Sequence, residues 1–156
     1  LNAQRNLFKL FLNDVGLLAS QYADGTALRV LSGDVNINYG AIYENLVAQE
    51  LRIHGYDLYF FNSKKQGELD FVIENDAEII PIEVKSGKDY ERHNALKNVL
   101  DSSAYNIKKA YVLCNSNLSV RENIIYAPIY MLMFIKRNVM SSNTIYKNDF
   151  ASLKLK

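Results

Sequence analysis

The chain has 156 residues, of which 49% are hydrophobic and 22% are charged, and its formal net charge is +1 at pH 7. This length and composition fit one globular domain and exclude a disordered or fibrous protein. The near-neutral charge excludes a protein that attracts nucleic acid through its overall field, so any such contact requires a local basic patch. The single cysteine, Cys114, excludes an internal disulfide and a thiolate zinc cluster, which predicts a reducing compartment and a cytoplasmic location.

The sequence predicts no membrane helix and no signal peptide. The longest apolar run, 127–135, has about half of the roughly 18 to 20 residues that a membrane span requires, so no membrane partner is expected. The chain begins at Leu1 rather than at a methionine, and it lacks the order of a signal peptide. These features predict a piece of a longer protein.

The first part of the chain has weak and changing patterns. Alternation of apolar and polar residues predicts a short strand over 8–12, and Asn13-Asp14 then caps a helix over 15–22. Glycines, aspartates and asparagines in 23–39 predict a loop that contains one short strand at 28–31.

A clear helical pattern follows. Apolar residues at helical spacing predict a helix over 42–53, and Gly55 stands where a C-terminal glycine ends a helix. Asn75-Asp76 is a hairpin signal between two apolar runs. A meander of three short strands is therefore predicted, over 58–61, 68–74 and 78–86.

The second half of the chain returns to the same sheet. The remaining predicted elements are a helix over 90–105, strands over 110–114 and 124–127, and a closing helix that begins at Pro128 and runs to Ile135. A helix between two strands implies a parallel neighbour pair, so the fold class is α/β with a mixed sheet. The predicted organisation is one domain over 1–137, with a lead-in region at 1–39, a core at 40–137 and a polar tail at 138–156.

The chemistry of this chain is concentrated on the meander. Alternation along a strand places Glu83 and Lys85 on one face, whereas Ile82 and Val84 face the core. Asp70 lies on the preceding strand, and the hairpin brings it to the same face near Glu83. Two carboxylates and the carbonyl of Val84 can hold Mg²⁺ or Mn²⁺, and Lys85 can orient water or neutralise charge that develops on a phosphodiester.

The alternative is that Glu83 and Lys85 are simply two solvated charges on an exposed strand face. Cations flank the proposed site, and they either contact phosphates or form a solvated face: Lys64, Lys65, Lys88 and Arg92. The tyrosines follow the apolar periodicity, so they are predicted to be core residues rather than platforms for base stacking.

The helix over 42–53 offers two further carboxylates. Glu50 lies near the middle of its apolar arc and Glu44 at the margin. Either can be a partly buried carboxylate that faces the strands, or a capped or snorkelling side chain. The helical wheel alone does not choose between them.

These residues together resemble the PD-(D/E)XK nuclease superfamily. The resemblance covers Gly40-x-x-x-Glu44-x-x-Val47-x-x-x-Leu51-x-x-x-Gly55-Tyr56, then Glu68-x-Asp70, then Ile82-Glu83-Val84-Lys85-Ser86. Within the superfamily, the chain is most similar to the uncharacterised C-terminal domain of prokaryotic AAA-type ATPases, in which a region much like 8–18 follows a P-loop domain. One departure is Leu69, which stands where the family name has proline.

The resemblance implies a restriction-endonuclease-like mixed sheet flanked by helices. It implies that Asp70 and Glu83 are metal ligands, Lys85 the catalytic lysine and Glu44 the helix carboxylate that assists them. The function it implies is a metal-dependent nuclease-like domain that acts on DNA, with an ATPase domain upstream in the same chain. The alternative is a non-catalytic module that couples such an ATPase to DNA or to a protein.

Overall fold

The structure, a computed structural model, describes residues 7–22, 25–34, 37 and 39–137. In chain order, its elements are α1 (Val15–Ser20), α2 (Thr26–Leu31), α3 (Gly40–Ile53), β1 (Tyr59–Ser63), β2 (Gly67–Asn75), β3 (Glu78–Val84), α4 (Asn94–Leu100), β4 (Ala110–Cys114), β5 (Ser119–Arg121), β6 (Ile124–Pro128) and the 3₁₀ helix η1 (Ile129–Phe134).

The strands form one mixed sheet of six, in the order β1-β2-β3-β4-β6-β5. The meander β1-β2-β3 is antiparallel, β4 pairs in parallel with both β3 and β6, and β5 is an antiparallel edge strand. Helix α4 makes the crossover between the parallel strands β3 and β4, as such a connection requires. The predicted α/β class and mixed sheet are therefore confirmed.

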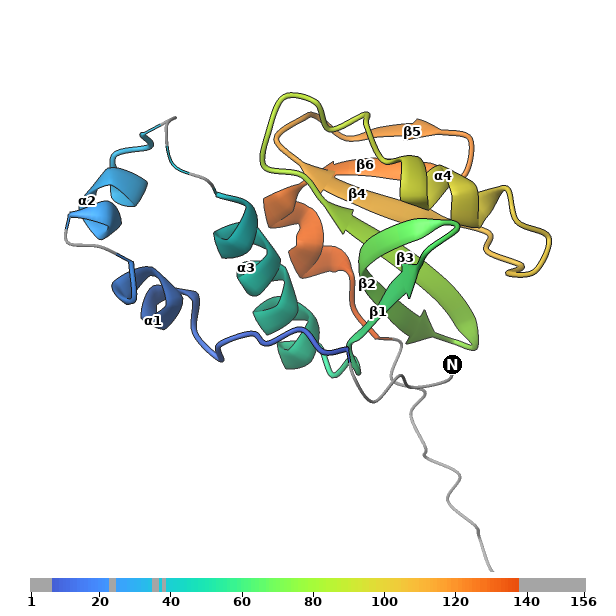
Figure 1. Ribbon diagram of the computed structural model, residues 1–156, viewed down its shortest axis with the longest axis horizontal. Helices are drawn as coiled ribbons and strands as arrows, with labels where there is room; N and C mark the ends of the chain where they lie inside the picture. Colours follow the sequence, from blue (N-terminus) through green and yellow to red (C-terminus); the bar gives the residue numbers. More distant parts are fainter. Residues whose placement is uncertain (1–6, 23–24, 35–36, 38, 138–156) are drawn as a thin grey trace, which may run out of the picture.

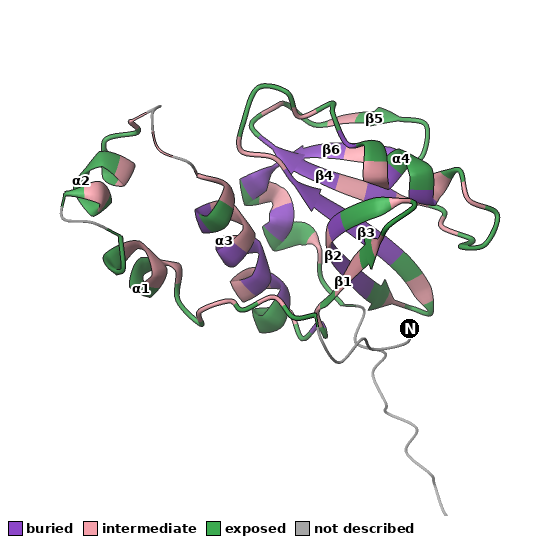
Figure 2. Cartoon of the chain, viewed as in Figure 1, coloured by how far each residue is buried: buried purple, intermediate pink, exposed green. Residues whose placement is uncertain are grey.

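Helices cover both faces of this sheet, as Figure 1 shows. On one face, Val47 and Leu51 of α3 and Leu132 of η1 belong to one buried cluster with side chains of β2 and β3. On the other face, Leu96 and Val99 of α4 belong to a second buried cluster. The buried colour of Figure 2 is accordingly concentrated on the central strands and on the sides of the helices that meet them. The domain is a three-layer arrangement around the sheet.

Helix α3 ends as the sequence predicts. Gly55 has a φ of 82°, in the left-handed region that glycine adopts readily. The N–H of Tyr56 donates to the Leu51 carbonyl at 3.0 Å, and that of Gly55 donates to the Arg52 carbonyl at 3.0 Å. These bonds satisfy carbonyls that the last turn of a helix leaves unpaired.

Strand β2 contains a bulge that the sequence did not reveal. Tyr59 of β1 pairs with Val72, but Phe61 pairs with Leu69, so β2 contains one more residue than β1 between these two pairs. Bulges of this kind redirect side chains and often lie beside functional sites. Asp70 lies within this interval.

Several predicted elements have other boundaries or another type. The strand expected at 28–31 is wrong, because these residues belong to α2, which begins after Gly25 at a φ of 82°. The strand expected at 8–12 is also wrong, because the backbone of Leu12 bonds to a side chain of α3 rather than to a strand. The helix expected over 90–105 is only α4, and the closing helix is the 3₁₀ helix η1. The three-residue strand β5 was not predicted.

Some further predictions are confirmed, and others concern residues that the structure does not describe. Asp14 caps α1 as expected, since its Oδ1 accepts from the N–H of Leu17 at 2.8 Å. The predicted hairpin between β2 and β3 is present, but its two-residue turn consists of Asp76 and Ala77, one residue later than the Asn75-Asp76 signal. Their φ angles of 51° and 61° suit a tight hairpin. The tail at 138–156 and parts of the loop at 23–39 lie outside the described residues.

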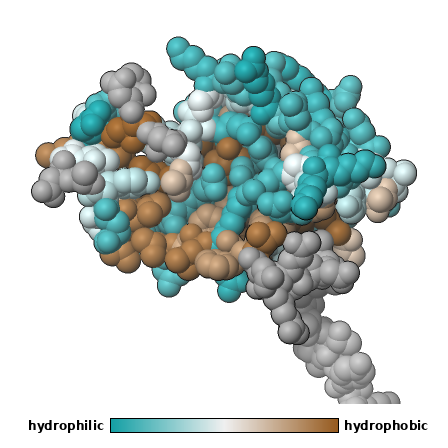
Figure 3. Space-filling view, viewed as in Figure 1, coloured by the Kyte–Doolittle hydropathy of each residue, from teal (hydrophilic) through white to brown (hydrophobic). Residues whose placement is uncertain are grey.

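The helices of the lead-in region leave apolar side chains exposed. Every described residue of α1 and α2 is at least partly exposed, including Leu17, Leu28 and Leu31. In Figure 3 brown, apolar surface extends over the side of the molecule where Figure 1 places these helices. Within the described part of the chain, no helix has the length and apolar character needed to cross a membrane.

Candidate functional site

The end of β3 presents Glu83 and Lys85 together, as predicted. The Nζ of Lys85 donates to Oε1 of Glu83 at 2.7 Å. The backbone N–H of Lys85 donates to the Leu113 carbonyl at 2.8 Å, which extends the pairing of β3 with β4 beyond Val84. Glu83 is only 6% exposed, so its carboxylate is held by the strand and shielded from water.

Asp70 approaches β3 where the β2–β3 ladder ends. The last backbone pair of this ladder joins Phe71 to Ile82. One residue further, Oδ2 of Asp70 accepts from the backbone N–H of Val84 at 2.9 Å. The Asp70 carboxylate therefore takes the place of a backbone carbonyl as the acceptor between the two strands. Its bond is to the residue directly before Lys85.

Burial and a neighbouring negative charge act together on Glu83. Burial raises the pKa of Glu83, the charge of Asp70 raises it further, and the hydrogen bond from Lys85 lowers it without cancelling the rise. The Oε2 atom of Glu83 is buried and has no hydrogen-bond partner among the described residues. A buried carboxylate oxygen without a hydrogen-bond partner, next to a second carboxylate, is energetically unfavourable. A bound cation would provide the missing partner for this oxygen.

The structure separates the two glutamates of α3. Glu44 is half-buried, and burial followed by the charge of Asp70 raises its pKa, so the two carboxylates share one region. Oε2 of Glu50 instead lies 3.6 Å from Nε2 of His54, the C-cap of the same helix. Glu44 is therefore the helix carboxylate that faces the strands.

A cation that the sequence did not single out lies within this acidic cluster. The Nζ of Lys9 is 2.8 Å from Oε1 of Glu68, 3.5 Å from Oδ1 of Asp70 and 3.9 Å from Oε2 of Glu44. Burial alone would lower the pKa of Lys9, but the hydrogen bond to Glu68 and the three negative charges raise it above its ordinary value. Its ammonium also lies 5.9 Å from the ring centre of Phe60. Lys9 thus shows that this position attracts a positive charge.

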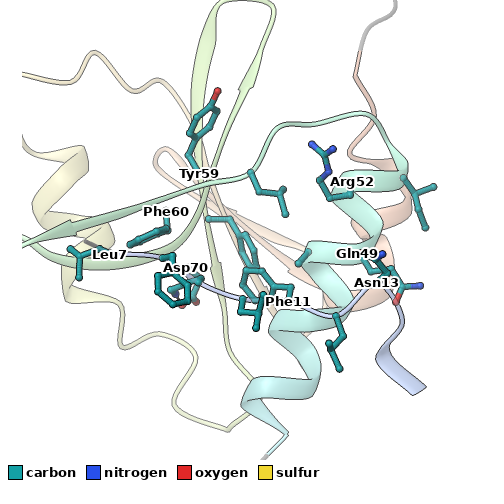
Figure 4. A pocket seen from close by; sticks show the side chains of 16 residues that line it. Leu7, Phe11, Asn13, Gln49, Arg52, Tyr59, Phe60 and Asp70 are labelled. Carbon is teal, nitrogen blue, oxygen red and sulfur yellow. The ribbon is translucent and has the colours of Figure 1, made fainter. Parts of the chain in front are cut away.

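Lys9 reaches the cluster because residues 7–13, here called the strap, are anchored across α3. The buried side chain of Asn45 accepts from the N–H of Leu12 at 2.7 Å and donates to its carbonyl at 3.1 Å. The Phe11 ring lies 5.3 Å from that of Phe71. Figure 4 shows the strap, which bears Phe11, running past Asp70 toward α3. On a helical wheel Asn45 lies outside the apolar arc of the helix, so no sequence pattern indicated this contact.

The predicted flanking cations lie on two exposed connections. Lys64 and Lys65 occupy the turn between β1 and β2, and Lys88 and Arg92 occupy the loop between β3 and α4. The first turn is held beside α4, because Asn98 donates to the Gln66 carbonyl at 3.1 Å. Their role as phosphate contacts stays a prediction.

The site offers few possible ligands for a metal ion. The described residues contain no group of three or more histidine, cysteine, aspartate or glutamate side chains arranged to hold a metal ion. Asp70 and Glu83 with the Val84 carbonyl form a smaller set, which suits Mg²⁺ because this ion keeps several of its water ligands. The unpaired oxygen of Glu83 and the ammonium drawn into the cluster both fit a divalent cation at this place.

One comparison with known proteins gives a match. A family model described as a domain of unknown function, DUF4143, matches residues 39–132. No curated protein and no solved structure matches the chain. The matched segment contains Glu44, Asp70, Glu83 and Lys85, whereas Lys9 precedes it.

Proposed function

Because the chain belongs to the DUF4143 family, a domain of unknown function, we propose its activity from the site itself: a metal-dependent nuclease-like domain that acts on DNA phosphodiesters. The observation that carries this proposal is the buried Glu83, which has one oxygen unpaired, the charge of Asp70 beside it and the ammonium of Lys85 on its other oxygen. A buried carboxylate beside a second carboxylate and a lysine is uncommon in a merely structural role, since burying a charge costs free energy.

Each residue of the site has a distinct role in the proposed reaction. Asp70, Glu83 and the Val84 carbonyl would hold Mg²⁺ or Mn²⁺. When bound, such an ion supplies Lewis-acid chemistry and makes water a better nucleophile near neutral pH. The Lys85 ammonium, fixed at 2.7 Å from Glu83, stabilises the negative charge that develops on the phosphate oxygens. Glu44 adds negative charge from the helix side, which strengthens cation binding.

The resemblance to the PD-(D/E)XK superfamily supports this assignment, because its motif residues meet at one place in a mixed sheet flanked by helices. The same resemblance supports an ATPase domain upstream in the protein. Lys64, Lys65, Lys88 and Arg92 are exposed cations on two connections beside the sheet, and they would contact DNA phosphates.

Metal binding tests the proposal directly. We expect Mg²⁺ or Mn²⁺ at millimolar concentration to raise the thermal midpoint, because an ion that binds only the native state at ten times its Kd adds about 1.4 kcal/mol. Asp70→Asn should abolish this rise. Glu74→Gln, which changes an exposed carboxylate on the same strand, is the matched control and should retain it. An unchanged midpoint with both ions would refute a metal site here.

Removing Lys9 should strengthen metal binding. Its ammonium lies 3.5 Å from Asp70 and so competes with the ion for this carboxylate. Lys9→Met is therefore expected to raise Mn²⁺ affinity about fivefold, as for loss of a competing ion pair of about 1 kcal/mol. Titration calorimetry measures this, and Lys9→Arg, which keeps the charge, should bind like the wild type. A weaker affinity in Lys9→Met would show that Lys9 supports the site instead.

A second candidate is a non-catalytic module that couples an ATPase to DNA or to a protein. It is favoured by the ammonium of Lys9 in the acidic cluster, and by the exposed leucines of α1 and α2, which offer an apolar contact surface. The metal titration separates the candidates, because only the nuclease requires the ion.

A further inference from the structure

A cleft of about 770 Å³ opens beside the candidate site. It is bounded at one end by Ser86, Gly87 and Lys88, which directly follow Lys85, and by Asn115, which directly follows β4. The Nδ2 of Asn115 donates to the Ser86 carbonyl at 3.4 Å and ties these two chain segments together. The cleft thus lies at the carboxyl ends of two parallel strands, the edge at which open α/β sheets bind their ligands.

Three tyrosines line this cleft. Tyr39 and Tyr43 stand one helical turn apart at the start of α3, with ring centres 5.7 Å apart and ring planes tilted by 37°. Tyr90 comes from the loop before α4, and its ring is held edge-on against Tyr126 at 5.9 Å. All three are half-buried, whereas the sequence predicted that such residues belong to the core. All three are partly exposed and contribute to the lining of the cleft.

The polar groups of the cleft are few and suit a nucleotide. Lys88 is exposed at the rim and can pair with a phosphate. Asn115 adds an amide, which can bond to the edge of a base. Aromatic faces bind bases of any sequence by stacking. A duplex keeps its bases stacked on each other, so only an unpaired base can use these rings.

We propose that this cleft binds an unpaired nucleotide of single-stranded DNA, next to the phosphodiester that the Asp70, Glu83 and Lys85 site acts on. The inference rests on the proposed function for its choice of DNA, and it names the class of DNA that this site takes. The cleft has the size of a small-molecule site, about 300 to 1,000 Å³, so it admits one nucleotide rather than a folded partner. Stacking in the cleft would place the next phosphate beside Lys85.

Binding is measured without cleavage. A single-stranded 12-mer DNA that carries 2-aminopurine is titrated with the full chain in EDTA, and the fluorescence reports stacking. We expect quenching on binding and a weaker binding of the duplex with the same sequence. Tyr39→Leu should remove the quenching and weaken binding about tenfold, whereas Tyr39→Phe, which keeps the ring, should do neither. Tyr130→Leu changes an exposed tyrosine outside the cleft and should bind like the wild type.

Lys88→Ala gives an independent readout that does not depend on the aromatic rings. It should weaken single-strand binding and lower the slope of log affinity against log salt by about 1. Equal affinity for duplex and single strand, or full quenching in Tyr39→Leu, would overturn the proposal. Cleavage by the wild type separates the two proposals: quenching by a wild-type protein that cleaves no DNA in Mg²⁺ or Mn²⁺ supports the cleft and refutes only the nuclease, whereas cleavage without quenching refutes only the cleft.

Discussion

Replacing Lys85 with methionine is expected to lower the rate of DNA cleavage about 100- to 1,000-fold while the domain keeps its fold. Removing one preorganised donor that stabilises developing charge has an effect of this size. The fold should survive because the Lys85 ammonium is partly exposed, and its backbone N–H, which bonds to Leu113, is unchanged by the substitution. Metal affinity should not fall, because Lys85 supplies no ligand and its ammonium pairs with the Glu83 carboxylate.

Nicking of supercoiled plasmid in Mn²⁺ measures this effect, with linear, branched and single-stranded DNA as further substrates. Lys97→Met is the matched control, since Lys97 is an exposed lysine of α4. Because an upstream ATPase domain is part of the proposal, the assay is also run on the longer protein with ATP. Equal rates for the wild type and Lys85→Met on every substrate would end the nuclease assignment and favour the interaction module.

Replacing Glu83 with glutamine should have two opposite effects. It should abolish the metal response, since the charged ligand is lost. It should also stabilise the metal-free domain at pH 7, by an amount on the order of 1 kcal/mol, which is typical when a strained functional group is neutralised. The reason is that Glu83 is buried, has a carboxylate oxygen without a hydrogen-bond partner among the described residues, and lies next to the charge of Asp70.

The pH dependence of stability follows from the same cause. The folded state raises the pKa of Glu83 above the ordinary value, so protonation favours folding. The contribution of Glu83 to stability is complete below its unfolded pKa and is lost as the pH rises through the folded pKa. In Glu83→Gln this loss should be absent. Metal binding has the opposite dependence, because only the charged carboxylate binds the ion.

Urea unfolding of the metal-free protein, measured from pH 5 to pH 8, tests both statements. Glu78→Gln is the control on the same strand. The hydrogen bond from Lys108 lowers the pKa of Glu78, so its contribution to stability is present above its ordinary pKa, and the variant should gain no stability at pH 7. A Glu83→Gln variant that is less stable than the wild type at pH 7 would show that the carboxylate serves the fold.

The sheet and its chemistry could be predicted from sequence where the signals are local. Glu83 and Lys85 are two residues apart on one strand, so alternation alone puts them together. The turn before β3 and the glycine after α3 also depend on residues adjacent in the chain. The structure confirms these local predictions, with the turn placed one residue later than its signal.

The missed features depend on contacts between distant residues. Asp70 lies near Glu83 as predicted, but the bulge of β2 that contains Asp70 left no composition signal. Lys9 meets Asp70 across 61 positions of sequence. Helix α2 was mistaken for a strand because its apolar residues are exposed rather than arranged on one buried face, so no helical period was visible.

The clamp between Asn45 and Leu12 has a consequence for the boundaries of the functional unit. A protein cut at Tyr39, where the family match begins, would keep all four predicted site residues. It would nevertheless leave the buried carboxamide of Asn45 without its two backbone bonds, and the ring of Phe71 without Phe11. A transfer of this domain to another protein must therefore include the strap. The strap supplies Lys9 to the acidic cluster, yet it lies outside residues 39–132, which match the family model.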